Sequence, residues 1–235
     1  SWSFMAALAE LGGVDWFNLG DMDLALHVLR TAALARGQTL SQIIAGFAKS
    51  WQIAAAILPM SDDPVATMID TEIGTLEFQR YFVERRCAPV VRRVRFEGAE
   101  QAIPAPGVLD SIASADAVLI APSNPFLSMD PLLAIPAIRA ALADCSAPVV
   151  AVSPLIGGQS IKGPTSKLIG ELGLAPDNAM IARHYGDILD GLVIDSGDSC
   201  EVAGIAIAQT DTLMHSLDDK LRVARAALDL AASIV

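Results

Sequence analysis

The feature that most constrains the fold is a series of short, continuously apolar segments in the carboxy-terminal half of the chain. These segments cover residues 117–121, 148–152, 192–195 and 204–208. Segments with helical periodicity precede or follow them at 108–114, 131–144, 165–172 and 216–233. Strands that are apolar at every position are typical of a parallel sheet covered by helices on both faces. The sequence therefore predicts a three-layer α/β fold with a mainly parallel sheet.

The first hundred residues follow a different pattern. Helical periodicity covers 2–11, 21–36 and 39–49, and the apolar run 54–58 is interpreted as a strand. Segments 65–71 and 76–82 are expected to be joined by a turn at Gly74, and 90–96 alternates Val with Arg like a half-exposed strand. We therefore predict one Rossmann-like α/β domain over residues 1–235. Residues 1–100 form its more helical, insert-like part, and residues 101–235 form its regular α/β part.

Charge, hydropathy and cysteine spacing disfavour a nucleic-acid-binding protein, a membrane-spanning protein and a cysteine metal site. The 235 residues carry a net charge of -11, which disfavours a nucleic acid because phosphate contacts need clustered Lys and Arg. No apolar run is long enough to predict a membrane span. The three cysteines, Cys87, Cys145 and Cys200, are far apart and lack metal-ligand spacing. They are interpreted as reduced thiols of a cytoplasmic protein.

Small polar residues follow four of the predicted strands. The segments concerned are Ser61-Asp62-Asp63, Pro122-Ser123-Asn124-Pro125, Ser153-Pro154 and Gln209-Thr210-Asp211-Thr212. In an open parallel sheet, ligands bind outside the carboxyl ends of the strands. We expect these four strand ends to line one crevice.

A glycine-rich loop follows the strand at 148–152. Gly157, Gly158 and Gly163 would let the backbone approach a ligand closely and direct N–H groups at an anion, with Lys162 adding a positive charge. Thr165 is expected to cap the next helix, whose first turn favours a phosphate. An ordinary strand-to-helix loop explains the same residues, because the spacing matches neither known glycine fingerprint for nucleotides.

Two further motifs each have a chemical and a structural interpretation. Ser123 and Asn124 between prolines form either a rigid turn or a stiffly held ligand contact. Asp62 and Asp63 provide either the carboxylates that Mg²⁺ prefers or caps for a turn before Pro64. The residues alone leave both alternatives open.

Five spaced motifs, taken together and in this order, resemble the 2-phospho-L-lactate transferase family. They are Leu19-Gly20-Asp21-Met22-Asp23, Leu58-Pro59-Met60-Ser61-Asp62-Asp63, Ala121-Pro122-Ser123-Asn124-Pro125, Val152-Ser153-Pro154-Leu155-Ile156-Gly157-Gly158 with Ile161-Lys162-Gly163-Pro164, and Thr210-Asp211-Thr212-Leu213-Met214 before Asp218-Asp219-Lys220. The resemblance implies a magnesium-dependent transferase of coenzyme F420 biosynthesis. Such an enzyme moves a phospholactyl or phosphoenolpyruvyl group from a guanylylated diphosphate donor to the hydroxyl of the deazaflavin Fo and releases GMP.

The same resemblance implies roles for particular residues. The residues expected to bind the guanosine diphosphate part are Pro122, Ser123, Asn124, Pro125, Ser153, Gly157, Gly158, Lys162, Gly163, Pro164, Thr210 and Asp211. The residues expected to contact the deazaflavin are Asn18, Leu19, Gly20, Asp21 and Met60. Ser61, Asp62 and Asp63 are expected to be catalytic, with Asp62 binding Mg²⁺. A homodimer is also implied.

The chain departs from the family pattern in two places. The family's first strand and glycine-rich phosphate loop are not in this sequence, which opens at Ser1 in a stretch with helical periodicity, so we expect that an upstream segment is missing. Asn18 stands where relatives often have a basic residue. A second function remains open, that of a non-catalytic nucleotide- or nucleotide-sugar-binding regulatory protein of the same architecture.

Overall fold

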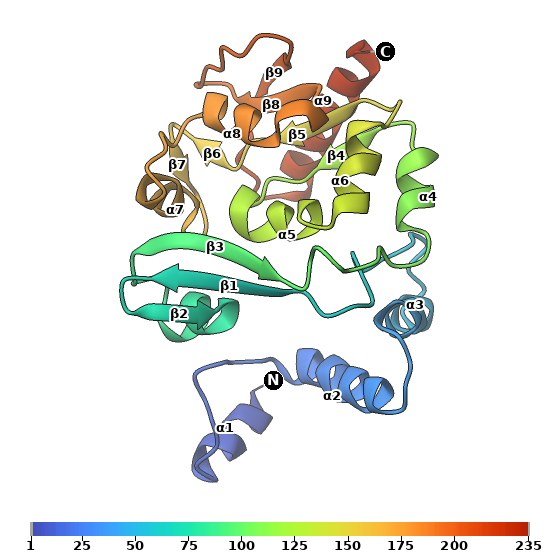
Figure 1. Cartoon of the computed structure of the whole chain (residues 1–235), viewed down its shortest axis with the longest axis vertical. Coiled ribbons are helices and arrows are strands. Elements are labelled where there is room, and N and C mark those ends of the chain that lie inside the picture. Colours follow the sequence, from blue (N-terminus) through green and yellow to red (C-terminus); the bar gives the residue numbers. More distant parts are fainter. Residues whose placement is uncertain (1, 235) are drawn as a thin grey trace.

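A four-stranded parallel sheet forms the centre of the molecule. The computed structural model describes residues 2–234. The strands are β4 (Val118–Ile120), β5 (Val149–Val152), β8 (Gly191–Asp195) and β9 (Ala206–Thr210), in the order β4-β5-β8-β9 (Figure 1). Every neighbouring pair is parallel. The parallel sheet predicted from the sequence is therefore confirmed.

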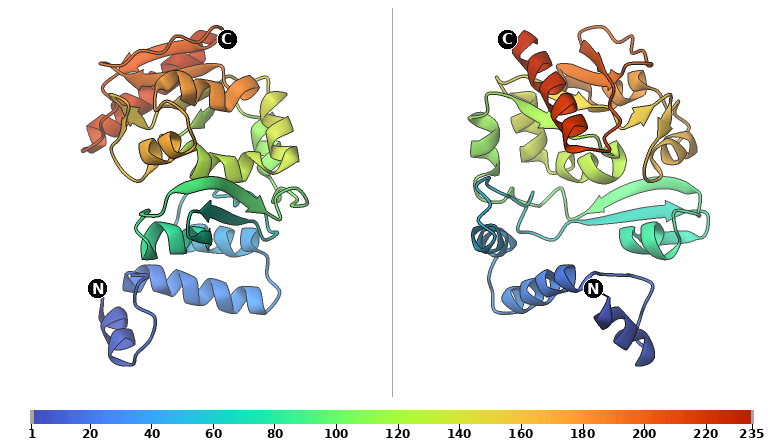
Figure 2. Two further views of the ribbon diagram at one scale, coloured as in Figure 1. Left: turned by 60° about the vertical axis from the view of Figure 1, so that its left-hand side comes forward. Right: turned by 180° about the vertical axis from the view of Figure 1, so that it is seen from behind.

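Both faces of the central strands β5 and β8 are buried, which explains why these strands are apolar as far as Val152 and Ile194. Val150, Val152 and Val193 pack on one face against helix α9 (Leu217–Ile234), which crosses the sheet in the rear view of Figure 2. Their chain neighbours Ala151 and Leu192 point to the opposite face, because successive strand residues alternate between faces. The three-layer α/β class is confirmed.

Short helices cover the second face of the sheet. They are α4 (Val108–Ala113), a π-helix η2 (Pro125–Met129), α5 (Asp130–Leu133), α6 (Pro136–Ala143), α7 (Thr165–Glu171), α8 (Asn178–Tyr185) and a 3-10 turn η3 (Gly186–Ile188). The single helix predicted over 131–144 is wrong, because Pro136 begins a new helix after the extended residue Ile135. Helix α8 was not predicted, although its first turn is capped by Asp177.

The amino-terminal part consists of three helices and an antiparallel sheet. The helices are α1 (Ser3–Glu10), α2 (Asp21–Ala35) and α3 (Leu40–Ser50). Thr39 and Gln42 form a capping box that starts α3. Strands β1 (Ala66–Thr71), β2 (Gly74–Glu77) and β3 (Val91–Glu97) pair antiparallel in the order β2-β1-β3. Figure 1 shows α1 and α2 projecting away from the rest of the molecule.

Two predictions for this part are wrong. Residues 54–58 form no strand, and Ile57 and Leu58 are exposed. The strand predicted at 76–82 ends at Glu77, and the π-helix η1 (Arg80–Glu84) replaces the rest of it. This helix turns Tyr81 into the core, where the side chain is completely buried.

The antiparallel sheet is joined to the main body by a shared core and two polar contacts. Ile69, Tyr81 and Val91 belong to the same buried cluster as the second face of the parallel sheet. Glu171 of α7 accepts a hydrogen bond from the Val91 N–H, and Lys167 donates to the Pro89 carbonyl. Within residues 2–234, no single helix is long and apolar enough to cross a membrane. The segments Pro125–Leu133 and Pro136–Ala143 meet the length and composition criteria only when they are counted as one, and a bend of 93° separates them.

Candidate functional site

A cleft opens at the carboxyl edge of the parallel sheet, where the sequence predicts the crevice. Its volume is about 200 Å³. It is lined by Pro122, Ser123, Asn124, Ser153, Pro154, Ile156, Ile161, Lys162, Thr165, Thr212, Leu213 and Met214. These residues follow β4, β5 and β9, so three of the four expected strand ends meet here. The fourth, Ser61-Asp62-Asp63, does not line the cleft.

Asn124 is the most informative residue of the lining. Its Oδ1 atom accepts hydrogen bonds from the Phe126 and Leu127 N–H groups at 3.0 and 3.1 Å, which fixes the side chain at the start of η2. Its Nδ2 atom is buried and has no hydrogen-bond partner, and it is the one such side-chain atom in residues 2–234. A buried donor without a partner costs about 1–3 kcal/mol. Because Asn124 also lines the cleft, this donor makes it a candidate ligand contact.

The glycine-rich loop is a small hairpin that forms the second wall. Strands β6 (Leu155–Ile156) and β7 (Gln159–Ser160) pair across Gly157 and Gly158, which both have positive φ angles as a tight turn requires. The expectation that the Gly157 N–H points at a bound anion is corrected, because it donates to the carboxylate of Asp198 at 2.9 Å. Gly158 and Gly163 lie in the same loop outside the lining, and so does Pro164.

Two side chains near the hairpin differ in their freedom to bind a ligand. Lys162 is exposed, borders the cleft and forms no ion pair within the described range 2–234. Ser153 is buried, donates its hydroxyl to Asn178 Oδ1 at 2.6 Å and accepts from the Leu155 N–H. The prediction that Thr165 caps α7 is wrong: Pro164 is the N-cap, no side chain caps the helix, and Thr165 lies buried against the cleft.

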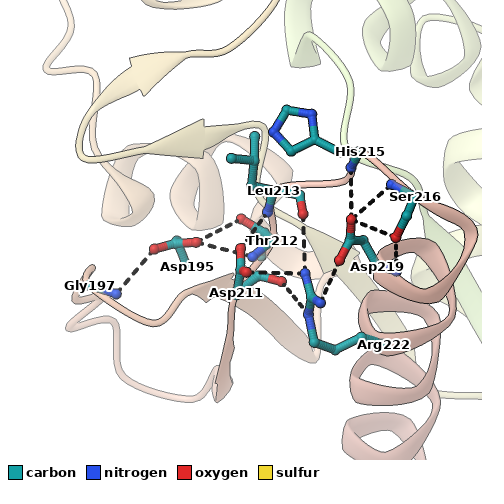
Figure 3. A network of polar contacts seen from close by, with 9 residues as sticks. All are labelled: Asp195, Gly197, Asp211, Thr212, Leu213, His215, Ser216, Asp219 and Arg222. Carbon is teal, nitrogen blue, oxygen red and sulfur yellow. Dashed lines mark hydrogen bonds and ion pairs between the residues drawn. The ribbon is translucent and has the colours of Figure 1, made fainter.

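The third wall follows β9 and is held by a polar network (Figure 3). Asp195 accepts hydrogen bonds from the Thr212 N–H and hydroxyl at 3.0 and 3.3 Å. The Thr212 N–H contributes most to holding the pKa of the Asp195 carboxyl below its usual range. Arg222 of α9 donates to the carbonyls of Asp211 and Leu213, so the backbone of this wall is fixed from two sides.

Asp211 and Asp219 complete the network behind the wall. The Asp211 carboxylate accepts from the Leu213 N–H and lies 3.2 Å from Arg222, so it does not point into the cleft. Asp219 accepts from the Ser216 N–H and pairs with Arg222, and the Ser216 bond is the largest cause that lowers its pKa. Together with Ser216, it caps the first turn of α9. Thr210, the last residue of β9, precedes the lining residues.

Ser61, Asp62 and Asp63 connect neighbouring segments outside the cleft. Both oxygens of Asp62 accept hydrogen bonds from Ser41 in the first turn of α3, one from its N–H at 2.6 Å and one from its hydroxyl at 2.7 Å. Asp63 accepts from the Ile103 N–H, and the Ser61 hydroxyl donates to the Ile103 carbonyl. These contacts join α3 and residue 103 to the segment 61–63 and are not a cap for a turn before Pro64, while the catalytic interpretation stays a prediction.

The side chains that the structure describes do not fit a resident metal ion. No group of three or more His, Cys, Asp and Glu side chains between residues 2 and 234 could hold one. Asp62, the residue expected to bind Mg²⁺, already has both oxygens engaged with Ser41. Protein sites for Mg²⁺ often use one or two carboxylates together with substrate phosphates. Any bound Mg²⁺ would therefore depend on the phosphates of a ligand.

The residues expected to contact the deazaflavin also lie outside the cleft. Asn18 to Gly20 precede α2, and Asp21 is its first residue. Asn18 is exposed. Met60 lines a separate apolar cavity of about 330 Å³ beneath β4, together with Leu58 and Ile120. Of the twelve residues predicted for the guanosine diphosphate part, five line the cleft: Pro122, Ser123, Asn124, Ser153 and Lys162. None of the residues predicted for the acceptor lines it.

Sequence reasoning missed two kinds of residue at the cleft. Ile156, Ile161, Leu213 and Met214 form its apolar lining, although they occur inside the recognised motifs. Asn178 and Asp198 support the hairpin from behind, and they occur in segments without any motif. Only the fold brings these two side chains next to Gly157.

The parallel sheet and the glycine-bordered cleft at its carboxyl edge define a Rossmann-like α/β protein with a small-molecule site at the ends of its strands. Residues 3–227 match the model of the family described as 2-phospho-L-lactate transferase CofD. The chain therefore belongs to this transferase family. Its resemblance to the family in sequence is confirmed.

Several relatives are named phosphoenolpyruvate transferase. The chain is 40% identical to the one from Streptomyces griseus, over 97% of this chain and 75% of the relative. It is 40% identical to the one from Kitasatospora aureofaciens, over 100% of this chain and 76% of the relative. The relative from Mycolicibacterium smegmatis is 35% identical, over 98% of this chain and 74% of its own length.

The fold is also found in a solved structure. A Bacillus halodurans protein of the UPF0052 family has a TM-score of 0.65 to this chain, covering 90% of this chain and 72% of its own. Only 15% of the residues are identical. This likeness concerns the fold alone.

Proposed function

We propose that this chain transfers a phosphoenolpyruvyl or phospholactyl group from a guanylylated diphosphate donor to the hydroxyl of the deazaflavin Fo, with release of GMP. Family membership gives the transferase class and the link to coenzyme F420 biosynthesis. The names of the relatives favour phosphoenolpyruvate as the transferred acid. The cytoplasm is the proposed location.

The observation that carries this proposal is the buried Nδ2 atom of Asn124 without a partner. A guanylylated diphosphate presents phosphate oxygens and a base carbonyl, which are the acceptors that such a donor lacks. Lys162 adds a positive charge at the same cleft. The apolar side chains of Ile156, Leu213 and Met214 suit the faces of a purine and exclude water from it.

The proposed chemistry needs positioning more than a covalent intermediate. The hydroxyl oxygen of Fo forms a bond to the phosphorus that carries the organic acid. The bond from this phosphorus to the bridging oxygen breaks, that oxygen leaves with GMP, and the hydroxyl proton passes to water. Phosphoryl transfer of this kind depends on in-line geometry and neutralised charge. Asn124 and Lys162 would hold the donor in place for it.

We further propose that Mg²⁺ enters the site bound to the donor's diphosphate, since the chain's own carboxylates do not form a resident site within the described residues. When bound, the ion neutralises phosphate charge. The predicted catalytic roles of Ser61, Asp62 and Asp63 and the deazaflavin contacts of residues 18–21 and Met60 remain part of the proposal. All of them belong to the acceptor side, which lies outside the donor cleft.

The homodimer implied by the family is proposed to form through the amino-terminal helices. In α1 and α2 only Met5 and Ala33 are buried, whereas Trp2, Met22 and Leu29 are exposed. An apolar surface of this kind is typical of an interaction site. Light scattering would give the mass of a dimer, and Leu29→Glu would shift it toward the monomer. A monomeric wild-type protein would contradict this part of the proposal.

The transferase proposal is tested by incubating the protein with Fo, Mg²⁺ and guanylylated phosphoenolpyruvate, and in parallel with the phospholactate analogue. Mass spectrometry then follows GMP and the modified deazaflavin. We expect both products in equal amounts. A reaction without Fo serves as the control, because donor hydrolysis alone would also release GMP.

Two outcomes would contradict this proposal. Release of GMP at the same rate without Fo would identify a hydrolase. Tight binding of the guanosine nucleotide with no product would favour a regulatory nucleotide-binding protein of the same architecture.

A further inference from the structure

The hairpin that forms one wall of the cleft is held by a line of hydrogen bonds, in which Asn178 and Asp198 have no assigned role. The line starts at Ser153, at the end of β5, where the hydroxyl donates to Asn178 Oδ1 at 2.6 Å. Asn178 then donates from Nδ2 to Asp198 Oδ2 at 3.2 Å. Asp198 in turn accepts from the Gly157 N–H at 2.9 and 3.2 Å. We call Ser153, Asn178, Asp198 and Gly157 the relay.

Burial makes the relay rigid at its inner end. Ser153 is 2% exposed and Asn178 is 4% exposed. Both polar ends of the Asn178 amide are engaged, because Oδ1 accepts from Ser153 and Nδ2 donates to Asp198. A buried amide with both ends paired has one preferred orientation, since reversal would turn the amide oxygen toward the Asp198 carboxylate, an acceptor against an acceptor. Asn178 therefore fixes the position of the Asp198 carboxylate.

The loop after β8 connects the relay to the opposite wall of the cleft. Asp198 donates its N–H to the carbonyl of Asp195 at 3.0 Å. The Asp195 side chain holds Thr212, which lines the third wall (Figure 3). One turn of chain, 195–198, thus contacts both the hairpin wall and the wall after β9. The separation of these two walls depends on this turn.

From this geometry we infer that Asn178 and Asp198 are positioning residues for the guanylylated donor. They hold the hairpin in place through the hydrogen bond from the Gly157 N–H to Asp198, and the hairpin in turn positions the donor. They do not line the cleft themselves. The hairpin and the residues after it place Ile156, Ile161 and Lys162 in the lining of the cleft. This inference rests on the proposed function for the identity of the ligand, and on the hydrogen bonds alone for the relay.

The donor and acceptor pattern of the relay allows a compensating exchange of residues. Asn178→Asp would place two carboxylates against each other, with no hydrogen between them. Asp198→Asn would turn its NH₂ group toward a donor in either orientation, the Asn178 NH₂ group in one and the Gly157 N–H in the other. In the double variant N178D/D198N the pattern is restored. The new carboxylate accepts from Ser153 and from the new amide, and the oxygen of that amide still accepts from the Gly157 N–H. The exchange leaves the net charge unchanged.

The first measurement is hydrogen exchange of the Gly157 amide by NMR, which needs no substrate. We expect exchange to accelerate about tenfold in N178D, the change that corresponds to about 1.4 kcal/mol. The double variant should return to within about threefold of wild type. Asp187→Asn is a matched control, because it breaks the ion pair with Arg139 far from the relay. Unchanged exchange in both N178D and Asp198→Ala would overturn the relay.

The second measurement separates positioning from general damage to the fold. In steady-state assays, N178D should raise KM for the guanylylated donor about tenfold while kcat changes less than about twofold, and the double variant should recover. A fall in kcat with an unchanged KM in N178D would overturn the positioning role. If wild type forms no product, the proposed transfer fails, and the same comparison made on GDP affinity then decides the inference separately.

Discussion

Replacing Asn124 with Asp separates the structural role of this side chain from its binding role. The two N–H groups of Phe126 and Leu127 can still bond to a carboxylate oxygen, so the turn at η2 is kept. The atom that changes is Nδ2, the buried donor without a partner, which becomes a negatively charged oxygen. The substitution therefore removes one donor from the cleft and adds one charge.

The size of the effect follows from these two changes. A hydrogen bond to a charged phosphate contributes about 1.5–3 kcal/mol. Two negative charges about 4 Å apart repel by about 4 kcal/mol at an effective dielectric constant of about 20. Partial screening by solvent and by Lys162 reduces the second value. We expect the Kd for GDP to rise at least about 100-fold, while the protein stays folded with a lower Tm because burial penalises the new charge.

Isothermal titration calorimetry with GDP, paired with thermal unfolding, measures both quantities. Gln38→Glu is the matched control, because it adds the same charge at an exposed position outside the cleft. It should leave the Kd within about twofold of wild type. An unchanged Kd in Asn124→Asp, with the protein still folded, would refute the assignment of Nδ2 to the ligand.

Three further predictions concern the wall after β9, acid stability and metal removal. Arg222→Lys keeps the charge but loses the guanidinium group that donates to both the Asp211 and the Leu213 carbonyls. Differential scanning calorimetry should show a stability lower by about 1 kcal/mol, and titration should show a weaker affinity for GDP. Unchanged values for both would contradict the role of Arg222 in holding this wall. Arg95 lowers the pKa of Asp70 from 3.8 to about 2, so the stabilisation from this pair is present above pH 3.8 and lost as the pH falls toward 2. Asp70→Asn should therefore flatten the fall of Tm over that pH range, and a slope equal to wild type would count against the pair. EDTA should abolish transfer and leave Tm unchanged, because the described residues form no resident metal site, and a large drop in Tm would reveal one.

The regular part of the fold is predictable from the sequence because burial on both faces leaves a clear pattern. The four strands are apolar except at their carboxyl ends in β8 and β9, where Asp195, Gln209 and Thr210 stand, and each was located to within about two residues. The failures occur where context decides. Residues 54–58 are apolar but pair with no strand, and Tyr81 is drawn into the core by a π-helix inside a strand-like segment.

The candidate site is predictable to the extent that it follows strand ends. Ser123, Asn124, Ser153 and Lys162 were placed at the cleft by their position after strands, and they lie there. Which polar atom is free for a ligand cannot be predicted in this way. Gly157 was expected to present its N–H, but a carboxylate distant in sequence, Asp198, accepts that bond. Only tertiary structure reveals that Asn124 has the donor without a partner.

The most direct test of the donor site is a crystal structure of the protein with GDP bound. We predict that the nucleotide lies in the cleft at the ends of β4, β5 and β9, with a phosphate or base oxygen within hydrogen-bond distance of Asn124 Nδ2. The Gly157 N–H should remain on Asp198. GDP bound elsewhere, with Asn124 Nδ2 still without a partner, would contradict the account.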